Sequence, residues 1–197
     1  MVRDFKAKIS FSPWVCVWCA ILLLTVPLRW VGAWLIAVAC HECCHILALM
    51  LFRKRIHGIY IGNFGAEIRS EFLQPAEAII CALAGPMAGV ILMLFARTYP
   101  RLALCGFLQT VFNLLPILPL DGGVALSGFL RMFWPPKTVD KISNMLENGL
   151  LLLLLFGTLL GTLIWKLGVI PLLVGTALFL RLKKRKIPCK WSLYRVQ

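Results

Sequence analysis

Charged side chains are scarce in this chain of 197 residues. Asp, Glu, Lys and Arg make up 15% of it, against roughly a quarter in soluble domains. Hydrophobic residues make up 60%, and the mean hydropathy is +0.87. These proportions argue against a water-soluble globular domain and indicate a protein embedded in a lipid bilayer.

Acidic residues are scarcer than basic ones. The chain has 8 Asp and Glu against 21 Lys and Arg, which gives a formal net charge of +13. It lacks a basic segment long enough to form a groove for nucleic acid, and it lacks a known RNA or DNA motif. The basic residues instead form short clusters between apolar runs, where anionic lipid headgroups would bind them. The sequence therefore predicts a lipid bilayer as partner and no nucleic acid.

The start of the chain lacks the signature of a cleaved signal peptide. Arg3, Lys6 and Lys8 precede the first apolar run, but that run has no small-residue cleavage site. We expect it to remain as a membrane span. The 8 cysteines lie mostly within apolar runs, where they act as small hydrophobic residues and not as a disulfide framework.

Apolar runs suggest six membrane spans, because a bilayer-crossing helix needs about 20 apolar residues. The expected spans are Phe11 to Leu28, Trp30 to Phe52, Ala76 to Ala96, Leu102 to the Leu120 region, Asn148 to Trp165, and the shorter Leu167 to Leu180. The predicted fold is an all-α polytopic membrane protein forming a single domain over residues 1–197. Its core would be 30–130, followed by extra spans at about 148–180 and a basic tail at 181–197.

The distribution of positive charge predicts the orientation. If both termini are cytoplasmic, all but four of the 21 Lys and Arg residues lie on the inner side. The exceptions are Arg29, Arg97, Arg101 and Lys166. Cytoplasmic loops carry an excess of Lys and Arg, so we expect a multi-pass protein with both termini in the cytoplasm.

The segment from Arg53 to Pro75 differs from its apolar surroundings. Residues 58–69 are rich in glycine and β-branched residues, with Gly62 and Asn63 in a turn. This pattern predicts a short β-hairpin. Two interpretations stay open: a surface loop, or a strand edge at the membrane face that receives an extended peptide.

The strongest chemical signal is an H-E-x-x-H motif within the second predicted span. It runs His41-Glu42-Cys43-Cys44-His45. Residues four apart share one helix face, so His41 and His45 can bind one ion, and Glu42 can act as a general base. An ionisable residue at the bilayer centre costs about 2.5–3.5 kcal/mol. Function therefore explains this motif better than packing does.

A third zinc ligand is needed, because catalytic zinc sites usually have three protein ligands. Asp121 follows Pro116 and Pro119, which should break the helix, and precedes Gly122-Gly123, which we expect to loosen the backbone. Irregular backbone at membrane depth is tolerated only where it lines protein or a cavity. Asp121 could be a simple turn residue, but beside an incomplete zinc site we favour a ligand.

Three motifs in this order resemble the site-2 proteases, a family of intramembrane zinc metallopeptidases. They are His41–His45, the Ala84–Gly89 segment AGPMAG, and an N-x-x-P-x-x-x-L-D-G element from Asn113 to Gly122. The six-span layout looks like the branch that contains the stage IV sporulation protease. The resemblance implies that Asp121 is the third zinc ligand and that Asn113 lies near the scissile peptide. It also implies that the hairpin re-enters the membrane and that the protein is bacterial.

The expected function is hydrolysis of peptide bonds in membrane-tethered proteins, within or near the bilayer and often releasing a regulator. A membrane regulatory protein is a further expected partner. Cys43 and Cys44 depart from the residues that the family more often has at these positions. Two roles stay open for them: inert filling, or an effect on metal choice or redox sensitivity. Two other functions remain open. A metal transporter or sensor would give Glu42 no special role, and an inactive scaffold would bind substrates without cutting them.

Overall fold

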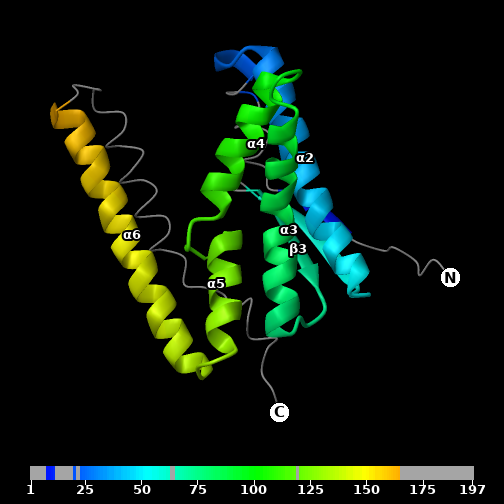
Figure 1. Ribbon diagram of the computed structural model, residues 1–197, viewed down its shortest axis with the longest axis vertical. Helices are drawn as coiled ribbons and strands as arrows, with labels where there is room; N and C mark the ends of the chain where they lie inside the picture. The colour runs from blue at the N-terminus through cyan, green and yellow to red at the C-terminus, as the bar shows by residue number, and fades with distance from the viewer. Residues whose placement is uncertain (1–7, 12–19, 21–22, 63–64, 119, 165–197) are drawn as a thin grey trace. The chain divides into compact units, whose positions relative to one another are not determined.

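The computed structural model describes residues 8–11, 20, 23–62, 65–118 and 120–164. Its elements, in chain order, are β1 (Lys8–Phe11), α2 (Leu28–Leu51), β2 (Ile56–Gly62), β3 (Gly65–Ser70), α3 (Pro75–Leu94), α4 (Pro100–Asn113), α5 (Asp121–Arg131) and α6 (Pro136–Ile164) (Figure 1). The chain divides into two compact units, Met1–Trp134 and Pro135–Gln197. The first unit carries all the residues of the predicted site.

Three helices in the described part of the chain are long and apolar enough to cross a bilayer. They are Leu28–Leu51, Pro75–Met93 and Pro136–Thr162. The first two match the spans predicted at 30–52 and 76–96. The third begins well before the predicted start at Asn148, because Pro136 suits the first turn of a helix and the polar residues after it stay helical. The span predicted at 167–180 and most of the first one lie outside the described residues, so the total of six stays a prediction.

The predicted fourth span is broken in the structure. Helix α4 has 14 residues and is about 21 Å long, which is shorter than the bilayer core of about 30 Å. It ends at Asn113, and α5 begins at Asp121. The loop between them contains Pro116, as expected from a residue that cannot donate a helical hydrogen bond.

The prediction that Gly122 and Gly123 loosen the backbone is wrong. Both lie in the first turn of α5. A Cβ atom at Gly123 would lie 2.5 Å from the carbonyl carbon of Ile117, and one at Gly122 would clash with the backbone of Leu114. These glycines instead allow the α4–α5 loop to fold tightly against the start of α5.

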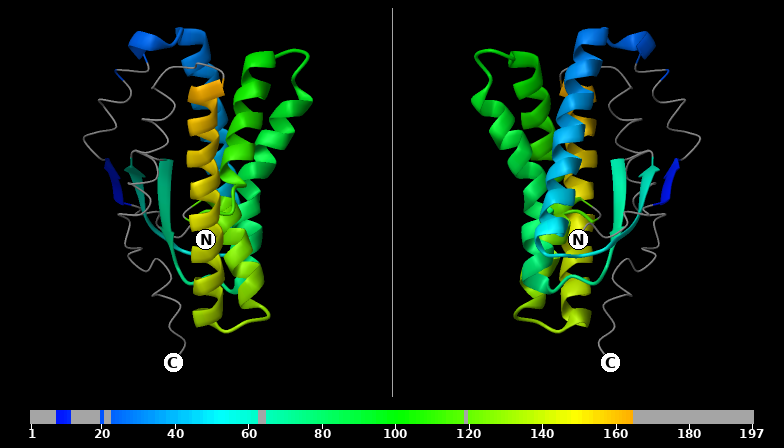
Figure 2. Two further views of the ribbon diagram at one scale, coloured as in Figure 1. Left: turned by 90° about the vertical axis from the view of Figure 1, so that its left-hand side faces the viewer. Right: turned by 90° about the vertical axis from the view of Figure 1, so that its right-hand side faces the viewer.

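The segment after α2 forms a small sheet and not only a hairpin. Strands β2 and β3 pair antiparallel, with Ile61 opposite Ala66. Strand β1 pairs parallel with β2, so the strand order is β1-β2-β3 (Figure 2). Strand β1 was not predicted, and Phe11, where the first span was expected to start, belongs to it. The fold is therefore mostly helical with a three-stranded sheet, and re-entry of the hairpin into a membrane stays a prediction.

The end of α2 directs the chain into this sheet. Arg53 has a φ of 55°, in the left-handed region. The backbone N–H of Lys54 donates to the Leu49 carbonyl at 3.0 Å, and that of Arg53 donates to the Met50 carbonyl at 2.9 Å. This pair of bonds is the Schellman arrangement that closes many helices, usually with glycine where Arg53 stands.

An ion pair ties the two ends of the hairpin together. Lys54 Nζ lies 2.7 Å from Glu77 Oε2 and donates to the Phe72 carbonyl at 3.0 Å. Glu77 also accepts a hydrogen bond from the backbone N–H of Gln74, at 2.8 Å, which caps α3. The hairpin therefore leaves α2 and enters α3 at one end of the helix pair.

Helix α3 is the centre of the first unit and contacts α2, α4 and α5 (Figure 1). Its buried residues are mostly small: Ala78, Cys81, Ala82, Gly85, Pro86, Ala88 and Gly89. Small residues let membrane helices approach closely. Thr110 of α4 donates a hydrogen bond to the Pro86 carbonyl at 3.1 Å, which links α3 to α4. Because α4 and α5 follow one another along α3, the break between them faces the middle of the helix bundle.

Candidate metal centre

The two histidines of the H-E-x-x-H motif face the interior of the first unit from the middle of α2. His41 is 4% exposed, and His45 is half-buried. Their Nε2 atoms lie 3.2 Å apart, and the rings meet edge to face with centroids 4.7 Å apart. The one-turn spacing therefore directs both Nε2 atoms to one point, as the sequence predicted.

Asp121 reaches the same point from the first residue of α5. Its Oδ2 atom lies 3.0 Å from His41 Nε2 and 3.3 Å from His45 Nε2. This oxygen is buried, yet it accepts no well-aligned hydrogen bond within the described part of the protein. The ligand-capable atoms of the three residues all lie within 4.8 Å of one another. Three potential ligand atoms therefore converge on one point, and one of them is a buried carboxylate oxygen without a hydrogen-bond partner among the described residues.

A carbonyl group of α3 orients His45. The Nδ1 atom of His45 lies 2.7 Å from the Cys81 carbonyl oxygen. A carbonyl only accepts, so Nδ1 must carry the hydrogen, and in the neutral ring Nε2 then has a free lone pair. Histidines that bind metals usually donate their other ring N–H in this way. Sequence reasoning missed Cys81, because a backbone carbonyl gives no signal in the residue type.

Gly85 provides the space in which the two imidazoles sit. A Cβ atom at this position would lie 2.7 Å from His41 Nε2 and 2.5 Å from His45 Cε1, and would clash with His45 Nε2. The AGPMAG segment thus places a residue without a side chain directly against the two rings. The sequence analysis singled out this segment by its resemblance to a family motif. The packing explains why a glycine is needed there.

The separations among the three atoms fit a zinc ion. Two ligand atoms that are each about 2.0–2.1 Å from a tetrahedral ion lie about 3.3 Å from one another. The three measured separations are 3.0, 3.2 and 3.3 Å. Two imidazole nitrogens and one carboxylate oxygen are also ligands that zinc commonly takes in catalytic sites. His41, His45 and Asp121 are therefore suited to hold zinc.

The other predicted site residues lie around this cluster. Glu42 is half-buried and follows His41 on α2. Asn113 is half-buried at the last residue of α4 and, among the described residues, makes no hydrogen bond to the cluster. Cys44 is a half-buried free thiol and Cys43 an exposed one. Neither thiol belongs to the group of converging ligand atoms.

Known proteins resemble this chain both in sequence and in fold. No protein-family model matches the chain. In an alignment of 186 positions it is 27% identical to stage IV sporulation protein FB of Bacillus subtilis, and the alignment covers 87% of this chain and 62% of that relative. Its fold matches that of a site-2 protease from Methanocaldococcus jannaschii with a TM-score of 0.64 and 18% sequence identity, covering 93% of this chain and 92% of the other. In sequence and in fold, the chain thus resembles the site-2 protease family, as its three motifs predicted.

Proposed function

We propose that this protein is an intramembrane zinc metalloprotease that cleaves membrane-tethered proteins within or near the bilayer. The observation that carries the proposal is the convergence of His41, His45 and Asp121 on one point midway along an apolar helix. The likeness to a sporulation protein and to a site-2 protease supports it. The same likeness supports a bacterial cell membrane as the location.

The metal would be held by the two histidine Nε2 atoms and by Asp121 Oδ2. When bound, zinc supplies a Lewis acid that polarises a peptide carbonyl and makes water nucleophilic at neutral pH. The hydrogen bond from His45 to the Cys81 carbonyl keeps the correct ring nitrogen free. Gly85 keeps the space beside both rings open.

Glu42 is the proposed general base. Its carboxylate takes a proton from the attacking water as the oxygen bonds to the peptide carbonyl carbon. The carbon–nitrogen bond then breaks, and Glu42 delivers the proton to the leaving amine. The products are a new carboxyl terminus and a new amino terminus. The role of Asn113 would be to hydrogen-bond the backbone of the scissile peptide as it lies over the site.

The substrate must offer an extended backbone, because a helix hides its carbonyl groups in internal hydrogen bonds. Within the described sheet, β2 is paired on both sides, whereas β1 and β3 are edge strands. Of these two, β3 belongs to the hairpin that follows α2. An edge strand can accept an extended peptide by strand addition. We infer that β3 is the docking edge. Gly65→Pro would remove a backbone donor from β3, and unchanged cleavage in that variant would refute strand addition there.

The topology proposed with this function has six spans with both termini in the cytoplasm. The clustering of basic residues supports it. A membrane regulatory protein is the second partner that we propose, beside the tethered substrate. Reporter fusions after residues 97 and 197 should report opposite sides of the membrane, and reports from the same side would contradict this topology.

The first test measures zinc per chain by elemental analysis of detergent-purified protein. We expect about one zinc in the wild type, and loss or weakening in His45→Ala and in Asp121→Ala. Zinc retained by Asp121→Ala at wild-type affinity would remove that residue from the site. An absence of zinc in every sample, even after reloading, would favour an inactive scaffold.

The second test separates a protease from its rivals. Glu42→Gln should keep zinc and lose cleavage of tagged single-span proteins co-expressed in the same membrane. A metal transporter or a scaffold should tolerate this change, because neither needs a general base. Wild-type function in Glu42→Gln would therefore refute the proposed mechanism.

A further inference from the structure

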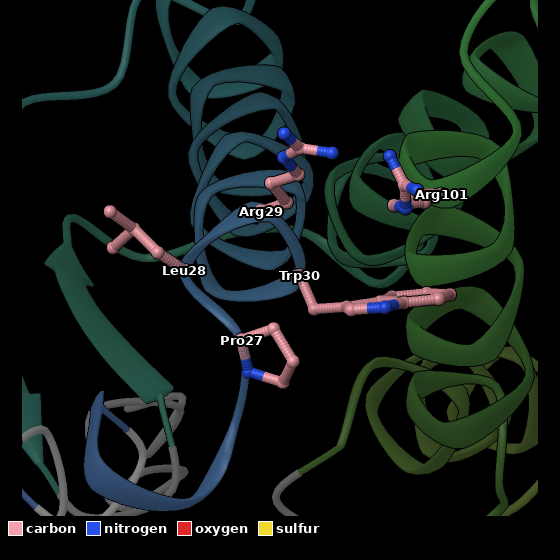
Figure 3. A pocket seen from close by; sticks show the side chains of 5 residues that line it. All are labelled: Pro27, Leu28, Arg29, Trp30 and Arg101. Carbon is pink, nitrogen blue, oxygen red and sulfur yellow. The ribbon is translucent and has the colours of Figure 1, made fainter.

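A pocket lies away from the candidate metal centre, at the start of α2 and of α4. A cavity of about 510 Å³ is lined by Pro27, Leu28, Arg29, Trp30 and Arg101 (Figure 3). Arg29 precedes His41 by three turns of α2, or about 18 Å. The cavity therefore does not belong to the candidate metal centre.

The two arginines come from different helices that pack together. Arg29 is in the first turn of α2 and Arg101 is in the first turn of α4, and these helices contact one another. Figure 3 shows both side chains directed into the space between the helices, with the Trp30 indole beside Arg101. The guanidinium carbon of Arg101 lies 5.9 Å from the centroid of the Trp30 ring. This cation–π contact orients one guanidinium and leaves its N–H groups available to a ligand.

The positive charge at this cavity has no negative partner in the nearby sequence. There is no acidic residue between Asp4 and Glu42, or between Glu77 and Asp121. In the part of the chain that the structure describes, the ion pairs involve neither arginine. The start of a helix also carries a partial positive charge, so arginine there does not serve helix stability. Two unneutralised guanidinium groups facing one cavity fit an anionic ligand.

Several features favour phosphate as the anion and a lipid as its carrier. A guanidinium group binds phosphate through two parallel hydrogen bonds. Tryptophan is enriched at both membrane–water interfaces, and long basic side chains near helix ends reach the headgroup region. Leu28, at 73% exposed, adds an apolar surface beside the arginines where the lipid glycerol and acyl chains would lie. We propose that this cavity binds the phosphate of an anionic phospholipid headgroup.

The test measures phosphatidylglycerol bound per chain by mass spectrometry, with the full chain in detergent and phosphatidylcholine as the neutral lipid. The variants are Arg29→Gln and Arg101→Gln. Arg101→Lys keeps the charge without the two-pronged donor. Arg97→Gln is the matched control, because Arg97 is exposed in the α3–α4 connection just before Arg101 but does not line the cavity. Thermal unfolding without lipid checks that every variant is folded.

We expect wild type and Arg97→Gln to bind phosphatidylglycerol equally and to prefer it to phosphatidylcholine. Each glutamine variant should bind about tenfold more weakly, and Arg101→Lys should be intermediate, since charge-assisted bonds to phosphate are lost or reduced. Wild-type binding by the glutamine variants, or an equal loss in Arg97→Gln, would overturn the proposal. Inorganic phosphate at millimolar concentration should not displace the lipid. Displacement would refute the lipid as the source and assign the cavity to soluble phosphate.

Discussion

Substitution of Gly85 by alanine should strongly weaken metal binding without unfolding the protein. The new Cβ atom would lie 2.7 Å from His41 Nε2 and 2.5 Å from His45 Cε1, whereas ordinary contacts begin at 3.4 Å. The His41 ring must therefore retreat by about 0.7 Å, and the His45 ring, whose Nε2 atom lies nearer still, by more than about 0.9 Å. Zinc–ligand distances tolerate only about ±0.2 Å, so the pair can no longer meet one ion at the correct geometry.

The helix itself should not suffer from this change. Alanine favours a helix interior over glycine by about 1 kcal/mol, and the atoms in the way belong to side chains rather than to backbone. The imidazole rings can swing aside at the cost of the hydrogen bond between His45 and the Cys81 carbonyl. We expect zinc affinity to fall at least about 10–100-fold, the loss typical when groups that orient a metal ligand are disturbed.

The assay is zinc content together with competition against a chelator, with helix content followed by circular dichroism. Gly32→Ala is the matched control, because Gly32 also lies in a long apolar helix, α2, but a Cβ atom there would meet nothing within 4 Å. Gly32→Ala should bind zinc like the wild type. If Gly85→Ala also bound zinc like the wild type, the geometric argument for the site would be refuted.

Three further changes test separate parts of the structure. Arg53→Gly should raise the free energy of unfolding by about 1 kcal/mol, measured as a higher Tm in detergent, because glycine adopts the left-handed conformation of Arg53 without strain; an unchanged or lower Tm would contradict the described end of α2. Gly89→Ala should lower the free energy of unfolding by about 1–3 kcal/mol, because its Cβ atom would lie 2.5 Å from the Gly106 carbonyl oxygen and overpack the α3–α4 contact. Gly157→Ala is the control: a Cβ atom there would meet no atom within 4 Å, so its Tm should not fall. Cys44→Ala should keep zinc at wild-type affinity, because its thiol is not among the converging ligand atoms; lost zinc would assign Cys44 to the metal.

The helices that carry the candidate metal ligands could be predicted, because the sequence patterns that specify them are local. The spacing of His41 and His45 places two rings on one helix face whatever surrounds the helix. Pro116 prevents α4 from continuing, because its ring removes the backbone N–H and clashes with the preceding helical turn. The long apolar runs predicted α2 and α3 closely, since a bilayer imposes one length on any helix that crosses it.

Other features depended on contacts between residues far apart in the chain. Strand β1 pairs with β2 although the whole of α2 lies between them in the sequence. A four-residue strand beside an apolar run also carries too little pattern to be recognised. The glycines after Asp121 were misjudged, because whether a glycine loosens a backbone or admits a neighbour depends on what lies against it. Here the neighbour is the α4–α5 loop.

The sequence by itself determined the membrane character of this protein, the helix that carries its histidines and the identity of the third candidate ligand. Those conclusions follow from residue type and spacing along a single helix or motif. Only the tertiary structure decided that Asp121 Oδ2 lies 3.0 Å from His41, that the Cys81 carbonyl orients His45, and that Arg29 and Arg101 share one cavity. Each of these joins separate helices, and such distances arise from helix packing, which no local pattern encodes.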